Sequence, residues 1–227
     1  MTRIVDLSVP LSKGIPSPPS INRQIEMQTW YRGPTHWQST LITMLLHTGS
    51  HVDFPRHCEA DGETAGDTPL DKACGDAIVL HIPDAGPSHE ITISDLARYE
   101  HLLKPGQIVL VRTDWADRMW GNFPSFYLDS PYCSPQAIKW LMERGPKAVG
   151  FDCFCEYPAR LPEFDSEDFK IHKAIFEGGG LLFQILTGLS QLPVAEPVPF
   201  FAGFLRIDGA EGVPARFFAV LPDSQAA

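Results

Sequence analysis

The sequence predicts an α/β fold in which one mixed β-sheet carries a few helices. Between residues 77 and 186, apolar runs of strand length alternate with segments of helical periodicity, which is the pattern of β-α-β units. Two further apolar runs, at 199–208 and 213–221, flank the turn-forming segment Gly209-Ala-Glu-Gly212 and predict an antiparallel hairpin. No linker or repeat interrupts the 227 residues, so we expect a single domain over residues 1–227.

The N-terminal part begins with a predicted strand at 3–7, followed by a loop over 10–19 that proline and glycine punctuate. Aromatic rings then gather just ahead of the next predicted strand, at Trp30, Tyr31, His36 and Trp37. We expect these side chains to pack in the core or at an interface. The continuous apolar run at 41–46 predicts a buried strand that ends in a glycine turn.

The middle of the chain carries clear helix signals. Thr92 and Asp95 predict a capping box at the start of one helix. Ser134-Pro135 opens a second helix and Gly145 closes it, because serine caps, proline suits the first turn and glycine ends helices. Helices are therefore expected at 93–103, 135–145 and 166–177, and strands at 77–82, 107–113, 148–153 and 181–186.

Composition restricts the function classes. Hydrophobic residues make up 44% and charged residues 20%, as in ordinary globular proteins. The net charge of −10 argues against a nucleic acid or an anionic membrane as partner. The 5 cysteines form no disulfide framework, and no secretory signal or run of membrane-spanning length is present. These features predict a reduced, cytoplasmic protein.

The segment from His47 to His57 holds three imidazoles and a carboxylate. A helical zinc-protease motif is excluded, because no glutamate follows His47 and the segment Thr48-Gly49-Ser50 is a poor helix interior. In an extended segment His51 and Asp53 share one face, and His47 can fold back onto it. Two neutral imidazoles and a carboxylate form a three-ligand site that leaves coordination positions for water and substrate.

The pattern His47-x-Gly49-Ser50-His51-x-Asp53-x-Pro55-x-His57 resembles the H-x-G-T-H-x-D-x-P-x-H signature of the cyclase family of metal-dependent hydrolases, which includes kynurenine formamidases and isatin hydrolases. It departs from the signature only at Ser50, which keeps the hydroxyl. The resemblance runs from about residue 6 to residue 221. It implies the swivelling β/β/α architecture and a homodimer or homotetramer.

The resemblance also points to His172 and Gln184. In kynurenine formamidases a histidine is followed twelve residues later by a glutamate, and both complete the metal site; this chain keeps the spacing but has Gln184. Isatin hydrolases place a glutamine ligand in the corresponding strand, so Gln184 is predicted as a fourth ligand. A neutral amide is a weaker, terminal ligand than a carboxylate, and we therefore expect one Mn²⁺ or Zn²⁺ ion, with a preference for Mn²⁺.

Two other segments are candidates for a role in the site. Arg112-Thr-Asp-Trp115, with Trp120, resembles the family's R-T-G-W segment, which closes over the same pocket, although Asp114 replaces the glycine. No catalytic role is assigned to it, and packing is the expected role of the tryptophans. Cys153-Phe-Cys155-Glu156 is read as ordinary strand residues.

The sequence therefore predicts a metal-dependent hydrolase that opens an amide, imide or lactone bond in a small cyclic or aromatic substrate. His57, just beyond Pro55, is the predicted general base, with His172 as the next candidate. Arylformamidase activity on N-formylkynurenine is the alternative reaction. A non-catalytic metal-binding relative is the alternative from another class, and Gln184 is its only support.

Overall fold

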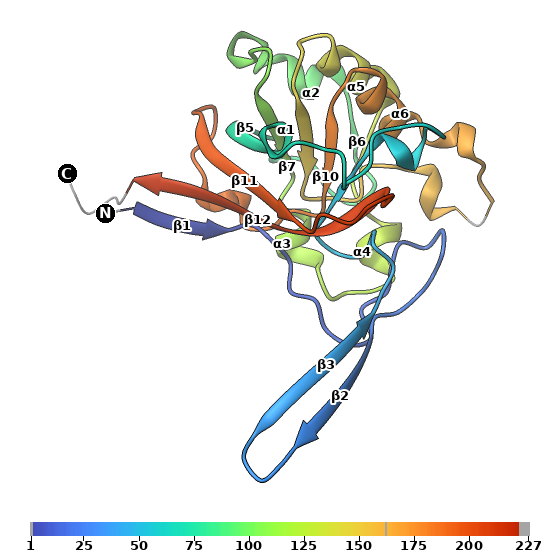
Figure 1. The fold of residues 1–227 in the computed structure, drawn as a ribbon. Helices are drawn as coiled ribbons and strands as arrows, with labels where there is room; N and C mark the ends of the chain where they lie inside the picture. The colour runs from blue at the N-terminus through green and yellow to red at the C-terminus, as the bar shows by residue number, and fades with distance from the viewer. Residues whose placement is uncertain (1, 162, 223–227) are drawn as a thin grey trace.

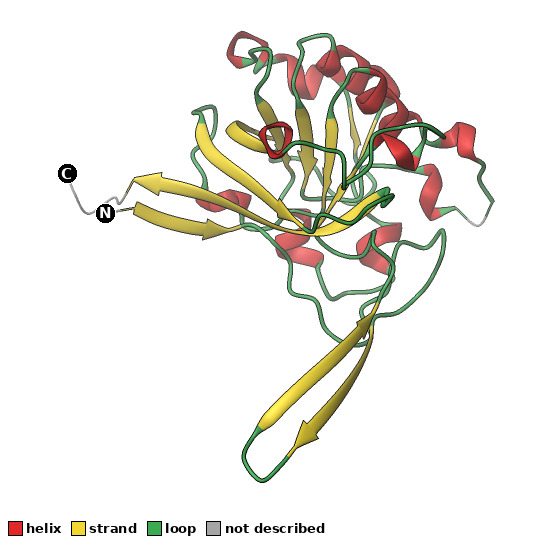
Figure 2. Cartoon of the chain, in the orientation of Figure 1, coloured by secondary structure: helices red, strands yellow, loops and turns green. Residues whose placement is uncertain are grey.

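In the computed structural model, which describes residues 2–161 and 163–222, one curved mixed sheet closes on itself (Figures 1 and 2). The order of its strands is β1-β12-β11-β5-β7-β9-β10-β4, and β4 also pairs with β12. Strands β5, β7, β9 and β10 run parallel, whereas β4, β11, β12 and β1 pair antiparallel. The strands of this sheet are β1 (Thr2–Asp6), β4 (His51–Asp53), β5 (Cys74–His81), β7 (Ile108–Arg112), β9 (Ala148–Phe151), β10 (Leu181–Gln184), β11 (Val198–Phe204) and β12 (Gly212–Pro222).

The helices are short and gather mainly on one side of the sheet (Figure 1). They are α1 (Leu70–Ala73), α2 (Ile93–Ala97), α3 (Trp115–Met119), α4 (Ser125–Leu128), α5 (Pro135–Met142) and α6 (Lys170–Glu177), with a small parallel pair β6 (Glu90–Ile91) and β8 (Tyr132–Cys133) beside them. The capping box of Thr92 and Asp95 and the Ser134 cap are both present. None of the helices in the described ranges is both long and apolar enough to cross a membrane.

Two apolar cores follow from this arrangement. One lies between the sheet and the helices and includes Ile138 and Ile175. The other lies inside the curl of the sheet, where Phe183, Phe200 and Phe217 pack with ring centroids 5.4–5.9 Å apart. Alternation along β12 places Phe217 inward and leaves Phe218 on the outer side, as expected for a strand with one buried face. The predicted α/β fold with a C-terminal hairpin is confirmed.

The prediction of a buried strand at 41–46 is wrong. That run is split between β3 (Trp37–Thr43) and the turn that leads to His47, and β3 pairs only with β2 (Glu26–Arg32) in an arm that projects from the body (Figure 1). Leu41 is 53% exposed and Ile42 44%. An apolar run predicts burial against something, but local sequence does not say whether that partner belongs to the same chain.

The predicted helix at 166–177 is also interrupted. A 3₁₀ turn covers Ser166–Asp168, Phe169 leaves helical geometry with φ −73° and ψ 58°, and α6 begins at Lys170. Asp165 and Asp168 form a capping box on the first turn, which competes with a continuous helix. The break turns Phe169 toward the site described below.

Candidate active site

Strand β4 positions the centre of the site. It lies between β10 and β12, so that His51 is paired with Gln184 on one side and with Pro214 on the other. Residues paired across a sheet share a face, and this register brings Gln184 next to the β4 side chains. Asp53, two residues from His51, lies on the same face and is fully buried.

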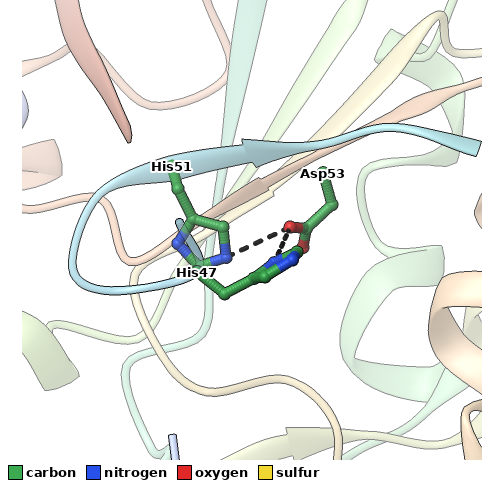
Figure 3. Close-up of side chains that lie close together, drawn as sticks. All are labelled: His47, His51 and Asp53. Atoms are coloured by element: carbon green, nitrogen blue, oxygen red, sulfur yellow. Dashed lines mark hydrogen bonds and ion pairs between the residues drawn. The ribbon is translucent and has the colours of Figure 1, made fainter. Parts of the chain in front are cut away.

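His47 turns back onto that face where glycines allow the chain to approach neighbouring side chains closely. Gly49 has φ +69°, and a Cβ atom there would come within 2.3 Å of Leu11. The His47 ring lies against Gly212, where an added Cβ would be 2.4 Å from the imidazole. The Nδ1 atom of His47 is 2.7 Å from Asp53 Oδ1, and its Nε2 is 3.2 Å from Glu211 Oε1. Figure 3 shows His47 and His51 converging on Asp53.

The donor set fits a divalent cation. The Nδ1–H of His51 donates to the Gly49 carbonyl over 2.7 Å, and this turns its Nε2 toward Asp53 Oδ1, 3.2 Å away. A metal ion or a shared proton can occupy the space between these two atoms. The other carboxylate oxygen, Asp53 Oδ2, is buried without a hydrogen-bond partner among the described residues. Ligand atoms of His47, His51 and Asp53 all lie within 4.8 Å of one another, and this spacing supports a metal site.

The remaining predicted residues surround this cluster. His57 ends a 3₁₀ turn, Pro55–His57, directly after β4, and its ring centroid is 4.2 Å from that of His47. His172, on α6, has its Nε2 3.5 Å from Asp53 Oδ2 and 3.4 Å from the Gln184 amide nitrogen. The structure thus gathers all six predicted residues around one cavity. Their individual roles stay predictions.

The electrostatics of the three rings differ. Burial opposes protonation of His47, but Asp53 outweighs it and raises the pKa of His47 to about 9. Burial also opposes protonation of His172, but the Asp53 carboxylate 3.5 Å away and the hydrogen bond to Glu156 raise its pKa to about 9. Burial lowers the pKa of His57 to about 3; Asp53 opposes this shift, and the three neighbouring histidines add to it. His57 is therefore neutral, and a nearby cation would disfavour protonation of all three rings.

The cavity has a volume of about 220 Å³. Beyond the six predicted residues, its wall is almost entirely apolar, with one serine hydroxyl. The wall residues are Pro18, Ser20, Ile21, Leu45, Phe154, Ala159, Phe164 and Phe169. They come from the N-terminal loop, the turn before His47 and the segment between β9 and α6. The site is therefore a small cavity that combines an apolar wall with the polar side chains of the candidate metal site.

Comparison with known proteins agrees with this geometry. The Cyclase family model matches residues 5–155. The chain belongs to the cyclase family. Among its relatives, the kynurenine formamidase of Erythrobacter litoralis (strain HTCC2594) is 28% identical over 98% of this chain and 96% of its own length. The kynurenine formamidase of Bordetella avium (strain 197N) is 30% identical over 77% of this chain and 80% of its own length.

Among solved structures, isatin hydrolase A from Labrenzia aggregata, bound to benzyl benzoate, superposes with a TM-score of 0.82. Its sequence is 26% identical to this cyclase-family chain, and the match covers 98% of this chain and 94% of the isatin hydrolase. The agreement in fold and family makes the chain a hydrolase. A non-catalytic role, the alternative from another class, is set aside.

The tryptophans of the Arg112-Trp115 segment and Trp120 pack, as expected. Trp115 is buried in the helix-side core, where its indole N–H donates to the Phe126 carbonyl, and Trp120 packs against Phe126 with a centroid distance of 5.0 Å. Neither tryptophan is among the described residues that line the cavity. Asp114 has φ +59°, in the left-handed region that favours glycine. This backbone conformation explains why the family has Gly at the position of Asp114.

Sequence reasoning missed three residues that contact the site. Glu211 accepts from His47, Glu156 from His172, and Cys155 lies against Gln184. Cys155 and Glu156 follow β9, at the carboxyl end of the parallel strands, where α/β proteins commonly place their sites. That position is the only signal in the sequence for Cys155 and Glu156.

Proposed function

We propose that this hydrolase opens the ring of a small, neutral, aromatic cyclic amide or ester, with one divalent ion held by His47, His51, Asp53 and Gln184. The observation that carries the proposal is the character of the cavity wall. Apart from the imidazoles and Asp53, the described residues that line it include no charged side chain. A flat, uncharged ring can be buried there at no electrostatic cost, whereas a charged group would lose its hydration without a partner.

Size supports the same substrate class. The cavity volume of about 220 Å³ lies below the range of roughly 300–1,000 Å³ typical of sites for drug-sized ligands. Phe154, Phe164 and Phe169 offer ring faces and edges to an aromatic substrate. N-formylkynurenine carries a charged amino-acid group, and the wall offers only the Ser20 hydroxyl for it.

The side chains have distinct tasks in the reaction. When bound, a divalent ion polarises a carbonyl group and lowers the pKa of water. His57 lines the cavity, and we assign to it the transfer of the proton from the attacking water to the leaving nitrogen or oxygen. The Nδ1–H of His172 donates to Glu156, so its Nε2 is the second ring nitrogen placed to transfer a proton within the site.

Gln184 also favours ring opening. An amide at this position leaves one less negative charge beside the ion than a glutamate would. Ring opening produces a carboxylate that stays attached to the product, and a less negative site repels that group less. A deformylation reaction benefits less from the missing negative charge, since its formate product can leave by diffusion. Arylformamidase activity remains the second candidate, because two curated relatives are kynurenine formamidases.

The test compares kcat/KM for isatin, a simple cyclic imide and N-formylkynurenine, for wild type and Gln184→Glu. We expect wild type to prefer a cyclic substrate by at least about tenfold, and Gln184→Glu to lose part of that preference. Elemental analysis should find one ion per chain, Mn²⁺ in preference to Zn²⁺, and none in Asp53→Ala. A tenfold preference of wild type for N-formylkynurenine would make the protein an arylformamidase instead.

A further inference from the structure

The segment after β9 touches two residues of the site at once. The Cys155 thiol lies 3.7 Å from Gln184 Oε1, and the Glu156 carboxylate lies 2.8 Å from His172 Nδ1. All four side chains are buried, with exposures of 4% or less. Two adjacent residues of one loop therefore hold a predicted ligand and a predicted proton acceptor.

Glu156 determines which nitrogen of His172 carries the proton. Its Oε2 atom also accepts the backbone N–H groups of Ile171 and His172, at 3.0 and 3.3 Å. Because all of these partners are donors, the Nδ1 of His172 carries a hydrogen, and its Nε2 faces Asp53 and Gln184. The Gln184 amide nitrogen lies 3.4 Å from that Nε2.

The other end of the amide lies against Cys155. The S–H group of Cys155 donates to Gln184 Oε1 over 3.7 Å. The NH₂ group of Gln184 faces His172, and the oxygen is held by the thiol. An amide binds a cation through oxygen, so Gln184 in this orientation is not a ligand.

We propose that Cys155 is a positioning residue that competes with the metal ion for the oxygen of Gln184. The amide must rotate by half a turn to offer its oxygen to the ion, and rotation breaks the hydrogen bond from the thiol. Cys155 thereby weakens metal binding and sets the metal affinity of the site. This inference rests on the metal site of the proposed function.

The test measures the Mn²⁺ dissociation constant of the full-length protein by competition with a chromophoric chelator. Cys155→Ala and Cys155→Val both remove the donor, and Val fills most of the space of the thiol. Both variants should bind Mn²⁺ about three- to tenfold more tightly than wild type, which corresponds to the loss of one hydrogen bond. Cys155→Ser keeps a donor and should stay within about twofold of wild type.

Two controls separate this role from a general effect on packing. Cys153→Ala removes a buried thiol of the same loop that makes no hydrogen bond to Gln184 among the described residues, and should leave Mn²⁺ affinity unchanged. In a Gln184→Ala background the Cys155 substitutions should also have no effect, because the contested oxygen is gone. Thermal unfolding of each variant shows whether it folds.

The outcomes distinguish two failures. If wild type binds Mn²⁺ and both Cys155→Ala and Cys155→Val bind it equally well, the positioning role is wrong and the proposed function stands. The inference is also overturned if the Cys155 substitutions still make Mn²⁺ binding tighter in the Gln184→Ala background. If wild type binds no divalent ion, the metal site and the inference fall together.

Discussion

At the scale of single residues, each imidazole of the site is oriented by its own acceptor. The Gly49 carbonyl fixes His51, the Glu156 carboxylate fixes His172, and His47 lies between Asp53 and Glu211. Such partners select the tautomer and hold the ring, so that the free nitrogen faces the ion or the substrate. His57 is the exception.

The described residues give the His57 side chain no hydrogen-bond partner, and its ring lies beside the rings of His47, Phe169 and His172. A ring held by packing alone, with both nitrogens available, suits a residue that accepts and returns protons. His57→Ala should keep the metal and lose about 10²–10⁴ in kcat, the usual contribution of a positioned acid–base group.

The measurement for His57 pairs steady-state kinetics with metal analysis. His101→Ala, which removes an exposed histidine far along the chain, is the control and should behave as wild type. If the metal is lost together with the His57 side chain, His57 is a ligand, and His172 becomes the candidate base.

At the scale of elements, the site depends on how β4 and the turn before it are attached to their neighbours. The Ser50 hydroxyl donates to the Ile185 carbonyl over 2.7 Å and accepts the Val9 N–H over 2.9 Å, and all three residues are buried. One hydroxyl thus joins the turn, the end of β10 and the N-terminal segment. The family signature has Thr at this position, and Thr carries the same hydroxyl.

Replacing Ser50 tests this attachment. Ser50→Ala leaves two buried backbone groups unpaired and should reduce the free energy of unfolding by about 2–4 kcal/mol. Ser50→Thr keeps the hydroxyl and should stay within about 1 kcal/mol of wild type. Urea titration in the presence of a chelator measures both without a contribution from metal binding. A loss below about 0.5 kcal/mol in Ser50→Ala would show that other contacts hold β4.

At the scale of the whole molecule, the arm of β2 and β3 exposes apolar side chains, and contacts within the single chain do not explain this exposure. Pairing of Trp30 with Ser39 and of Tyr31 with Gln38 places apolar side chains on both faces of the arm, with Leu41 on one face and Ile42 on the other. Isolated two-stranded hairpins are marginally stable in water. Apolar residues on both faces are typical of strands that are covered on both sides.

We propose that the arm packs against a second copy of the chain. Light scattering after gel filtration should find a homodimer or homotetramer for wild type. Leu41→Ser combined with Ile42→Ser should shift the population to monomers, because both apolar faces are interrupted. Gln38→Ser, an exposed polar change on the same strand, is the control. A monomeric wild type would rule out this role for the arm.

Sequence patterns alone predict the class of the fold, the positions of most strands and the side chains at the centre of the site. Strand and helix patterns depend on neighbours within a few residues, and His47, His51 and Asp53 lie within one short segment, so local rules reach them. Gln184 and His172 came only from the family resemblance, since no local rule links them to β4.

Tertiary structure decided the rest, because it depends on pairings between residues far apart in sequence. The register of β4 between β10 and β12 brings Gln184 opposite His51 and Gly212 beneath the His47 ring. The exposure of the arm and the positions of Cys155 and Glu156 have the same origin. Contacts of this kind are specified by the packing of the whole chain, which no local window of sequence contains.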